Sequence, residues 1–368
     1  MRMFTLWRVS PGAWASLGAI RFRTRTPALV ALALIAAAAL SACGGNSSST
    51  ASAGQTTSQT SRAASHHAGA SRASRASRAA APPVALRYRP LYALPAPLRD
   101  PAYATVGDGR FVMLGGLDAA DVSASEIEVA DLHGVVHTAT LSSPQHDAQA
   151  ALLGGKVYVF GGGDTTELDH ILMYDPARGG ESTVGSLSAP QSDVAVTQAA
   201  GTAYVVGGFD GTNYLDTIVA WRPGTRPAVV GHLPQGVRYA AVTVAGNALI
   251  ILGGVTTAGT SDAIYRFELG THRLRRIGTL PHPTEHGNAA TLGSTVYMIG
   301  GRGPSTTAQT AAVYAVNPLT GRVRHAGRLP TPLSDAAAVT IGRAIVVAGG
   351  QSPTSTQAGV GELVPAGA

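Results

Sequence analysis

Six short apolar runs along this 368-residue chain each end on two consecutive glycines. Successive pairs are separated by 46, 46, 46, 47 and 49 residues. A fixed period in this range predicts a repeat architecture, in which every repeat is one structural unit. The runs are four or five residues long and rich in β-branched and aromatic residues, which favours buried strands over helices. The first glycines of the six pairs are Gly115, Gly161, Gly207, Gly253, Gly300 and Gly349.

Each repeat is interpreted as four antiparallel strands. In the second repeat these are residues 148–153, 156–160, 171–176 and 182–187. The first two are joined by Gly154-Gly155, a short glycine turn that predicts a hairpin. At one position of the third strand most repeats have a large apolar residue. We expect these side chains to pack between neighbouring sheets. This column consists of Ala130, Tyr174, Trp221, Phe267, Val316 and Leu363.

The sixth repeat lacks a fourth strand, because the sequence given ends at Ala368. A segment with the fourth-strand pattern, including its closing Leu-Pro, lies before the first repeat at residues 84–95. We therefore expect this N-terminal strand to complete the last blade. Pairing this N-terminal strand with the last sheet closes the ring, and a closed ring lacks the exposed end sheets of an open array. The sequence predicts an all-β protein, a closed ring of six four-stranded blades over residues 83–368.

The repeat resembles the Kelch repeat of β-propellers, in the superfamily that includes the central domain of galactose oxidase. The resemblance rests on the apolar strand, the Gly-Gly pair, the polar loop and the Ile-x-x-Tyr-Asp-Pro pattern at residues 171–176. Kelch repeats usually have a tyrosine in the third strand and a tryptophan in the fourth. Here only Tyr174 keeps the tyrosine in its full setting, and no fourth strand has the tryptophan. The resemblance implies a six-bladed Kelch-type propeller.

The formal charge of +6 is a property of the N-terminus rather than of the repeats. Residues 1–82 contain nine of the 27 Lys and Arg residues and no acidic residue, so the repeats contain 18 basic and 21 acidic residues. A net charge near −3 is not typical of a nucleic-acid-binding domain, and we expect no nucleic-acid partner. The chain has a single cysteine, which excludes an intrachain disulfide.

The N-terminus has the pattern of an export signal. Arginines precede a 13-residue apolar run at 28–40, which is shorter than the ~20 residues of a membrane-spanning helix. The run ends in Leu40-Ser41-Ala42-Cys43, which resembles the lipobox of bacterial lipoproteins. The resemblance implies cleavage before Cys43 and lipidation of its sulfur. We expect a signal peptide at 1–42, a lipidated Cys43 with a disordered Ser/Ala/Arg linker at 43–82, and an exported protein anchored to the outer face of the bacterial cell membrane.

Two columns of polar residues precede the first strands of the blades. In a propeller these strands lie nearest the axis, so both columns are expected at one mouth of the central channel. The position six residues after each closing leucine gives the ring Asp100, Asp147, Asp193, Tyr239, His286 and Asp335. The preceding position gives Arg99, His146, Ser192, Arg238, Glu285 and Ser334.

Two interpretations of the ring aspartates remain open. Four carboxylates around one axis could bind a hard cation such as Ca²⁺. Aspartates at each blade start could instead be turn residues that bond nearby backbone amides, and we favour this structural interpretation. No other metal or cofactor is expected. The residues that differ from their column are Arg99, Arg238, Glu285 and His286, and these are the candidates for ligand binding or proton transfer.

The main functional hypothesis is a monomeric, surface-anchored binding module for a protein or glycan. The alternative is a carbohydrate-active enzyme of the sugar-acid mutarotase or epimerase kind, because six-bladed Kelch proteins include bacterial sialic-acid mutarotases. Copper chemistry of the galactose-oxidase kind is excluded, since its cofactor needs a Cys–Tyr cross-link and Cys43 lies in the lipobox. An arginine and an acid within ~3 Å of one common point in a concave pocket would favour the enzyme.

Overall fold

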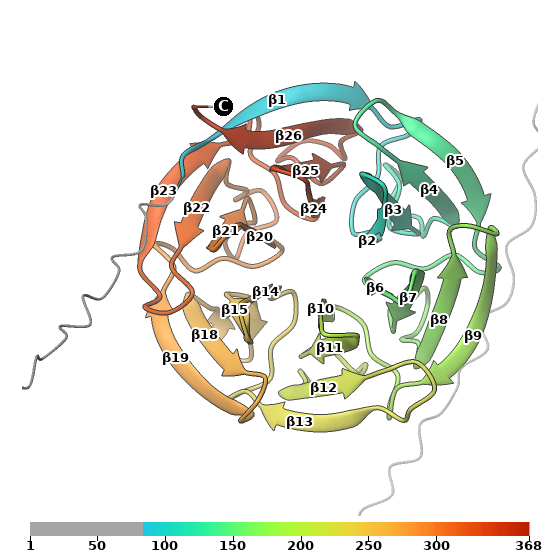
Figure 1. The fold of residues 1–368 in the computed structure, drawn as a ribbon, viewed down its shortest axis with the longest axis horizontal. Coiled ribbons are helices and arrows are strands. Elements are labelled where there is room, and N and C mark those ends of the chain that lie inside the picture. The colour runs from blue at the N-terminus through green and yellow to red at the C-terminus, as the bar shows by residue number, and fades with distance from the viewer. Residues whose placement is uncertain (1–83, 368) are drawn as a thin grey trace, which may run out of the picture. The chain divides into compact units, whose positions relative to one another are not determined.

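The computed structural model describes residues 84–367, which form a ring of six antiparallel sheets around a central channel (Figure 1). Every blade has four strands, and in five of them the strands follow chain order from the axis outwards. The prediction of an all-β, six-bladed propeller is therefore confirmed. The described part of the chain contains no helix that is long and apolar enough to cross a membrane. The predictions for residues 1–83, including the signal peptide, Cys43 and the linker, lie outside the described residues.

The strand bounds follow the period seen in the sequence. Blade 1 contains β2 (Ala102–Gly107), β3 (Arg110–Leu114), β4 (Glu126–Ala130) and β5 (Val135–Thr140). Blade 2 contains β6 (Gln149–Leu153), β7 (Lys156–Phe160), β8 (His170–Asp175) and β9 (Gly180–Ser186). Blade 3 contains β10 (Ala195–Ala199), β11 (Thr202–Val206), β12 (Thr217–Trp221) and β13 (Ala228–His232).

The second half of the ring repeats this arrangement. Blade 4 contains β14 (Ala241–Ala245), β15 (Ala248–Leu252), β18 (Ala263–Glu268) and β19 (Arg273–Thr279), and a small hairpin, β16 (Val255–Thr256) and β17 (Gly259–Thr260), lies in one of its loops. Blade 5 contains β20 (Asn288–Leu292), β21 (Thr295–Ile299), β22 (Ala312–Val316) and β23 (Val323–Arg328). Blade 6 contains β24 (Ala337–Ile341), β25 (Ala344–Ala348), β26 (Gly359–Pro365) and β1 (Leu86–Ala93).

The N-terminal strand closes the ring, as predicted. β1 pairs antiparallel with β26 from Leu86 opposite Pro365 to Ala93 opposite Gly359 (Figure 1). β1 is the outer edge of its sheet, which is where a strand proline such as Pro90 is tolerated. The last blade is therefore built from both ends of the described chain.

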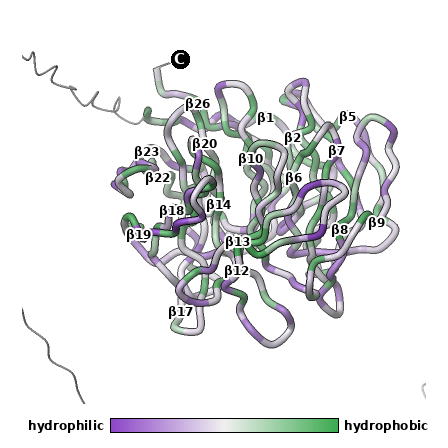
Figure 2. The backbone as a smooth tube through the Cα atoms, turned by 60° about the horizontal axis from the view of Figure 1, so that its bottom comes forward, coloured by the Kyte–Doolittle hydropathy of each residue, from purple (hydrophilic) through white to green (hydrophobic). Residues whose placement is uncertain are grey.

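Apolar side chains fill the spaces between neighbouring blades. Trp221 of blade 3 contacts Tyr158 and Phe160 of blade 2 edge-on, with ring centroids 5.0 and 5.5 Å apart. The whole third-strand column of Ala130, Tyr174, Trp221, Phe267, Val316 and Leu363 is buried, with at most 2% of any member exposed. The expectation that this column packs between sheets is therefore confirmed. In Figure 2 the hydrophobic colour follows the strands and the hydrophilic colour is concentrated in the connecting loops.

The glycine pairs connect each blade to the next. Gly161 has a φ of 61° and Gly162 a φ of 90°, a backbone region that glycine adopts readily. A Cβ on Gly161 would lie 2.1 Å from the carbonyl oxygen of Gln191, and the amide of Gly162 donates a hydrogen bond to that same oxygen (2.9 Å). Gln191 lies two residues before the predicted ring residue Asp193. The glycine pair of one blade thus positions the ring residue of the following blade.

Strand alternation defines two faces of the disc. We call the "mouth face" the one that carries the loops before the first strands and the loops after the glycine pairs. The "opposite face" carries the turns between the first and second strands and between the third and fourth. Both predicted polar columns lie on the mouth face.

Candidate functional site

The six ring residues share one unusual backbone conformation. All have a positive φ, between 50° and 58°. Five consecutive pairs are joined by a hydrogen bond from the amide of one ring residue to the carbonyl oxygen of the ring residue before it, at 2.9–3.2 Å. Among non-glycine residues, Asp, Asn and His are enriched in this region, which accounts for aspartate at four of the six positions. Tyr239, at φ 53°, is the bulky exception.

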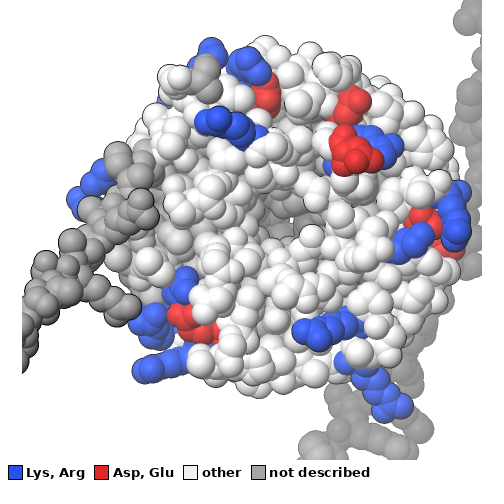
Figure 3. Space-filling view, in the orientation of Figure 1, with Lys and Arg blue, Asp and Glu red and all other residues white. Residues whose placement is uncertain are grey.

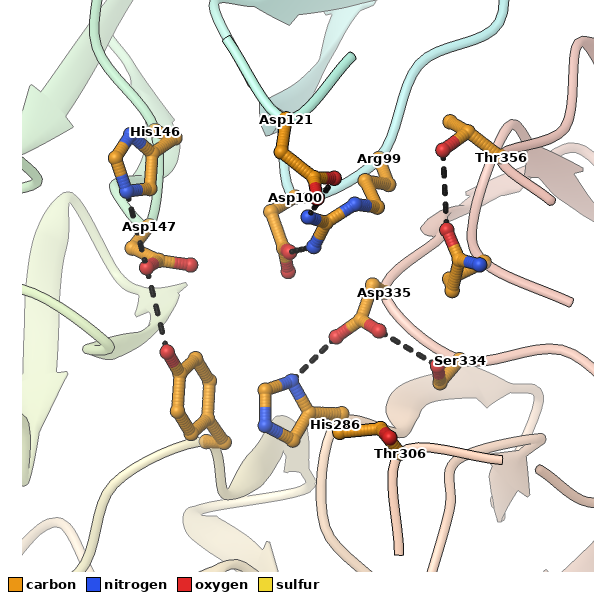
Figure 4. Close-up of polar contacts among 12 residues, drawn as sticks. Arg99, Asp100, Asp121, His146, Asp147, His286, Thr306, Ser334, Asp335 and Thr356 are labelled. Carbon is orange, nitrogen blue, oxygen red and sulfur yellow. Dashed lines mark hydrogen bonds and ion pairs between the residues drawn. The ribbon is translucent and has the colours of Figure 1, made fainter. Parts of the chain in front are cut away.

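Figure 4 shows four of the ring side chains, Asp100, Asp147, His286 and Asp335, pointing toward a common centre. All six line a cavity of about 60 Å³ at the mouth. Their recorded hydrogen bonds go to other side chains. Tyr239 donates to Asp147 at 3.3 Å, and Ser334 donates to Asp335 at 2.6 Å. The positive φ of the turn therefore accounts for the aspartates at these positions. We had expected their side chains to accept hydrogen bonds from backbone amides, and the hydrogen bonds described here go to other side chains instead.

Two arginines of the neighbouring column pair with ring carboxylates. Arg99 Nη1 donates to Asp100 Oδ2 at 3.2 Å, and Arg99 Nη2 donates to Asp121 at 2.7 Å (Figure 4). Arg238 forms an ion pair with Asp193, whose side chain is 1% exposed. The structure thus places an arginine and an acid in contact at two points of the concave mouth. In both pairs the acid lines the central cavity, while the arginine is not among the lining residues.

The guanidinium of Arg238 lies over three aromatic rings, of which the sequence interpretation singled out only that of Tyr239. Its Cζ is 4.6 Å from the ring centroid of Phe209, 5.5 Å from that of Tyr214 and 4.8 Å from that of Tyr239. Such contacts hold the planar cation by cation–π attraction. They fix Arg238 beside the buried carboxylate of Asp193.

His286 connects the ring to Arg302, which lies directly after a glycine pair. Its Nδ1 contacts Asp335, and its Nε2 lies 2.7 Å from Arg302 Nη2. A guanidinium can only donate, so Nε2 accepts this hydrogen bond and Nδ1 is the nitrogen that donates to Asp335. The imidazole also stacks on Tyr239, with ring centroids 3.6 Å apart. His286 is therefore held on three sides.

Glu285 and Arg302 form the outer layer behind His286. Arg302 Nη2 lies 3.6 Å from Glu285 Oε1, and the hydroxyl of Thr260 donates to Glu285 Oε2 at 2.8 Å. The residue that follows each glycine pair forms an isolated β-bridge, within its own blade, with the column that contains Arg99 and Glu285. Extending the glycine motif by one residue would have identified Arg302 and Phe209 from the sequence. That column is Leu117, Gly163, Phe209, Val255, Arg302 and Gln351.

The four ring carboxylates differ in their affinity for protons. Burial raises the pKa of Asp100 well above its usual range, and the carboxylates of Asp335 and Asp147 raise it further. Burial and the carboxylate of Asp147 raise the pKa of Asp193 to about 7, although Arg238 opposes this. Burial would raise the pKa of Asp335 as well, but His286 and the hydroxyl of Ser334 bring it below the usual value. Protonated and ionised carboxyls therefore share one cavity.

One group of ring residues has the geometry of a metal-binding set. Ligand atoms of Asp100, His286 and Asp335 all lie within 4.8 Å of one another. Two carboxylates and an imidazole suit a transition metal, whereas Ca²⁺ takes six to eight oxygen ligands. Both nitrogens of His286 already contact protein groups, so a metal ion would have to displace Asp335 or Arg302 from the ring.

The fold and the site together define a six-bladed β-propeller with an acidic channel mouth, where two of the ring carboxylates contact an arginine. Neither the protein-family models nor the curated proteins that were compared with the chain give a match. Among solved structures, the chain is similar to that of YjhT, with 15% identity and a TM-score of 0.62. The similarity covers 74% of this chain and 96% of YjhT. At this identity it supports the shared propeller fold alone.

Proposed function

We propose that this protein is a surface-anchored, Kelch-type propeller that binds a glycan at its channel mouth. The observation that carries the proposal is a cavity lined by carboxylates, two of which contact an arginine beside the cavity. Sugar hydroxyls both donate and accept, so they need carboxylates and guanidiniums side by side. Arg99 with Asp100 and Arg238 with Asp193 provide two such pairs.

Unused donors at the mouth support a polar ligand. Among the described residues, the Nε atoms of Arg99, Arg238 and Arg302 are buried and have no hydrogen-bond partner. Buried polar groups are normally satisfied by protein, water or ligand. The cavity of about 60 Å³ has space for only a few water-sized groups. The ligand we propose therefore inserts one terminal sugar or substituent while its remainder contacts the surrounding loops.

Calorimetric titration of a glycan and sugar-acid panel tests the binding proposal. We expect at least one sugar or sugar acid to bind, and Arg238→Ala to weaken that binding about tenfold or more, because the arginine that orients Asp193 is lost. Arg226→Ala, an exposed arginine on the opposite face, is the matched control and should leave the affinity unchanged. Equal losses in both variants, or no binding across the panel, would exclude the proposal.

A second candidate function, sugar-acid mutarotation or epimerisation, is favoured by the pair Asp100 and Asp335. These neighbouring carboxyls have pKa values displaced in opposite directions, which is the pattern of an acid and a base at one site. Asp335, oriented by His286, would take the proton of the anomeric hydroxyl. Protonated Asp100 would donate to the ring oxygen as its bond to the anomeric carbon breaks. Reclosure of the open chain on the other face inverts the anomer.

The remaining mouth residues take supporting roles in this candidate reaction. Arg99 and Arg238 would bind the carboxylate of a sugar acid, and Glu285 would hold Arg302 against His286. NMR measurement of anomer exchange tests the reaction. Asp100→Asn is expected to slow the enzyme about 10²–10⁴-fold, the usual contribution of a general acid. If the intact protein binds a sugar but leaves its spontaneous exchange rate unchanged, the binding function stands and the enzyme does not.

The anchoring part of the proposal rests on the lipobox sequence at residues 40–43. Labelling of cells with radioactive palmitate should mark the intact protein, and Cys43→Ala should abolish the label and release the protein from the membrane fraction. Ser41→Ala serves as a control that keeps the thiol. Retention of Cys43→Ala in the membrane would show that another element anchors the chain.

A further inference from the structure

Charge is divided unequally between the two faces of the disc. Counted with the strand residues that border them, the loops of the mouth face contain 14 Asp and Glu and four Lys and Arg. The turns of the opposite face, counted in the same way, contain four acids and eight bases. The basic residues of the opposite face are Arg110, Lys156, Arg178, Arg222, Arg226, Arg273, Arg322 and Arg343.

The acids of the opposite face are largely neutralised by their own neighbours. Asp175 forms an ion pair with Lys156, and Glu268 pairs with Arg266 at 2.7 Å. The side chain of Arg178 remains 85% exposed. Figure 3 views this face, where blue groups predominate around the rim and the channel opens at the centre. Arginines that are exposed here are Arg178, Arg222, Arg226, Arg273, Arg322 and Arg343.

The chain enters the propeller on this same basic face. β26 runs from the mouth face to the opposite face, and Leu86 at the start of β1 pairs with Pro365 at the end of β26. Tyr297 donates a hydrogen bond to the carbonyl oxygen of Val84 at 2.8 Å, which fixes the first described residue there. The segment before it, residues 44–82, contains four arginines and no acid in its sequence. Positive charge therefore continues from the face along the chain.

We propose that the opposite face binds an anionic lipid surface and directs the channel mouth away from it. Each exposed arginine near a membrane of anionic lipids gains electrostatic energy, while the acidic mouth is repelled. Both effects act over about 10 Å at 0.1 M salt, so they favour one orientation of the domain at the lipid surface. The proposal uses the folded domain alone and does not depend on glycan binding or on lipidation of Cys43.

Vesicle cosedimentation tests the attraction. Every strand of the ring lies within the compact unit Ala76–Ala368, which can be used without the lipid anchor. We expect this unit to bind phosphatidylglycerol vesicles at low salt and not phosphatidylcholine vesicles. The double variant Arg226→Gln, Arg322→Gln should weaken binding about 25-fold, at about fivefold per arginine.

The matched control is Arg276→Gln, Arg328→Gln, which removes two exposed arginines from outer strands away from the opposite face. It has the same net charge and should weaken binding less than fivefold. Equal weakening by the two double variants would mean attraction to total charge and would overturn the proposal. Failure to bind phosphatidylglycerol at low salt would overturn it as well.

Two single-cysteine probes test the orientation. Gly270→Cys lies in a turn of the opposite face where an added Cβ meets nothing within 4 Å, and Thr306→Cys lies in an exposed loop of the mouth face. A fluorophore at residue 270 should be quenched by head-group spin-labelled lipid, and one at residue 306 should not. Quenching at residue 306 alone, or equally at both sites, would contradict the proposed orientation.

Discussion

The two ends of the central channel are built from the same six strands but differ in chemistry. The mouth is a cavity of about 60 Å³ lined by all six ring residues, of which five are ionisable carboxyl or imidazole groups. The far end is larger, about 270 Å³, and is lined mainly by alanine, valine and threonine. The difference arises where each innermost strand begins, because the residue before it has a positive φ in all six blades and lines the cavity with a mostly ionisable side chain. The ionisable groups of the channel therefore lie in its smaller cavity, at the loops before the innermost strands.

The largest expected loss of stability comes from replacing a glycine on the mouth face, compared with a glycine on the opposite face. Gly161→Ala places a Cβ 2.1 Å from a backbone oxygen, whereas Gly154→Ala, in a hairpin turn of the opposite face, meets nothing within 4 Å. Both have a positive φ, which costs alanine about 1–2 kcal/mol. We expect Gly161→Ala to lose at least about 3 kcal/mol of unfolding free energy and Gly154→Ala only the conformational part. Urea unfolding followed by Trp221 fluorescence measures both free energies. Equal losses of unfolding free energy would show that the close contact of Gly161 with the following blade is not what requires glycine there.

Arg238→Ala should produce the next largest effect. It leaves the carboxylate of Asp193 buried without its cation, which typically costs about 3–5 kcal/mol at a fully buried pair. The loss should be smaller at pH 5, where Asp193 is protonated, than at pH 8. Urea unfolding at both pH values tests this, and a loss independent of pH would show that Arg238 acts only through its aromatic contacts.

The pH dependence of stability should follow Asp193. Its carboxyl titrates near 3.8 in the unfolded chain and at about 7 in the folded protein. Between these values the folded state binds more protons, so the unfolding free energy falls as the pH rises from about 4 to 7 and is constant above that. Asp193→Asn should flatten this slope in thermal unfolding measured from pH 5 to 8. An unchanged slope would assign the titration to another ring carboxyl.

The smallest effect is expected at the far end of the channel. The hydroxyl of Thr291 donates to the carbonyl oxygen of Val244 at 2.7 Å, and Thr291→Val removes this bond. We expect a loss of about 1 kcal/mol and no change in sugar binding. A change in ligand affinity measured by calorimetry would show that the ligand reaches into the larger cavity, and would remove the contrast between the two ends.

The ring could be predicted from the sequence because it depends on spacing. Six residues after each closing leucine is one backbone position, and the structure gives all six the same φ. Side-chain partners could not be predicted in this way. His286 contacts Asp335 of the following blade, while Arg99 contacts Asp100 beside it, and these choices depend on rotamers and on inter-blade geometry. Arg302 was missed because it follows the glycine pair, a position that was interpreted only as loop.

The pairing of β1 with β26 determines when the sixth blade can form. Leu86 belongs to the first described strand to be synthesised, yet its partner Pro365 belongs to the last. Five blades can close locally, but the sixth waits with an open edge until the C-terminal strand arrives. Loss of either terminal strand would expose that edge to pairing with another chain. β1 therefore stays without its β-sheet partner for the whole time that the rest of the propeller takes to be synthesised.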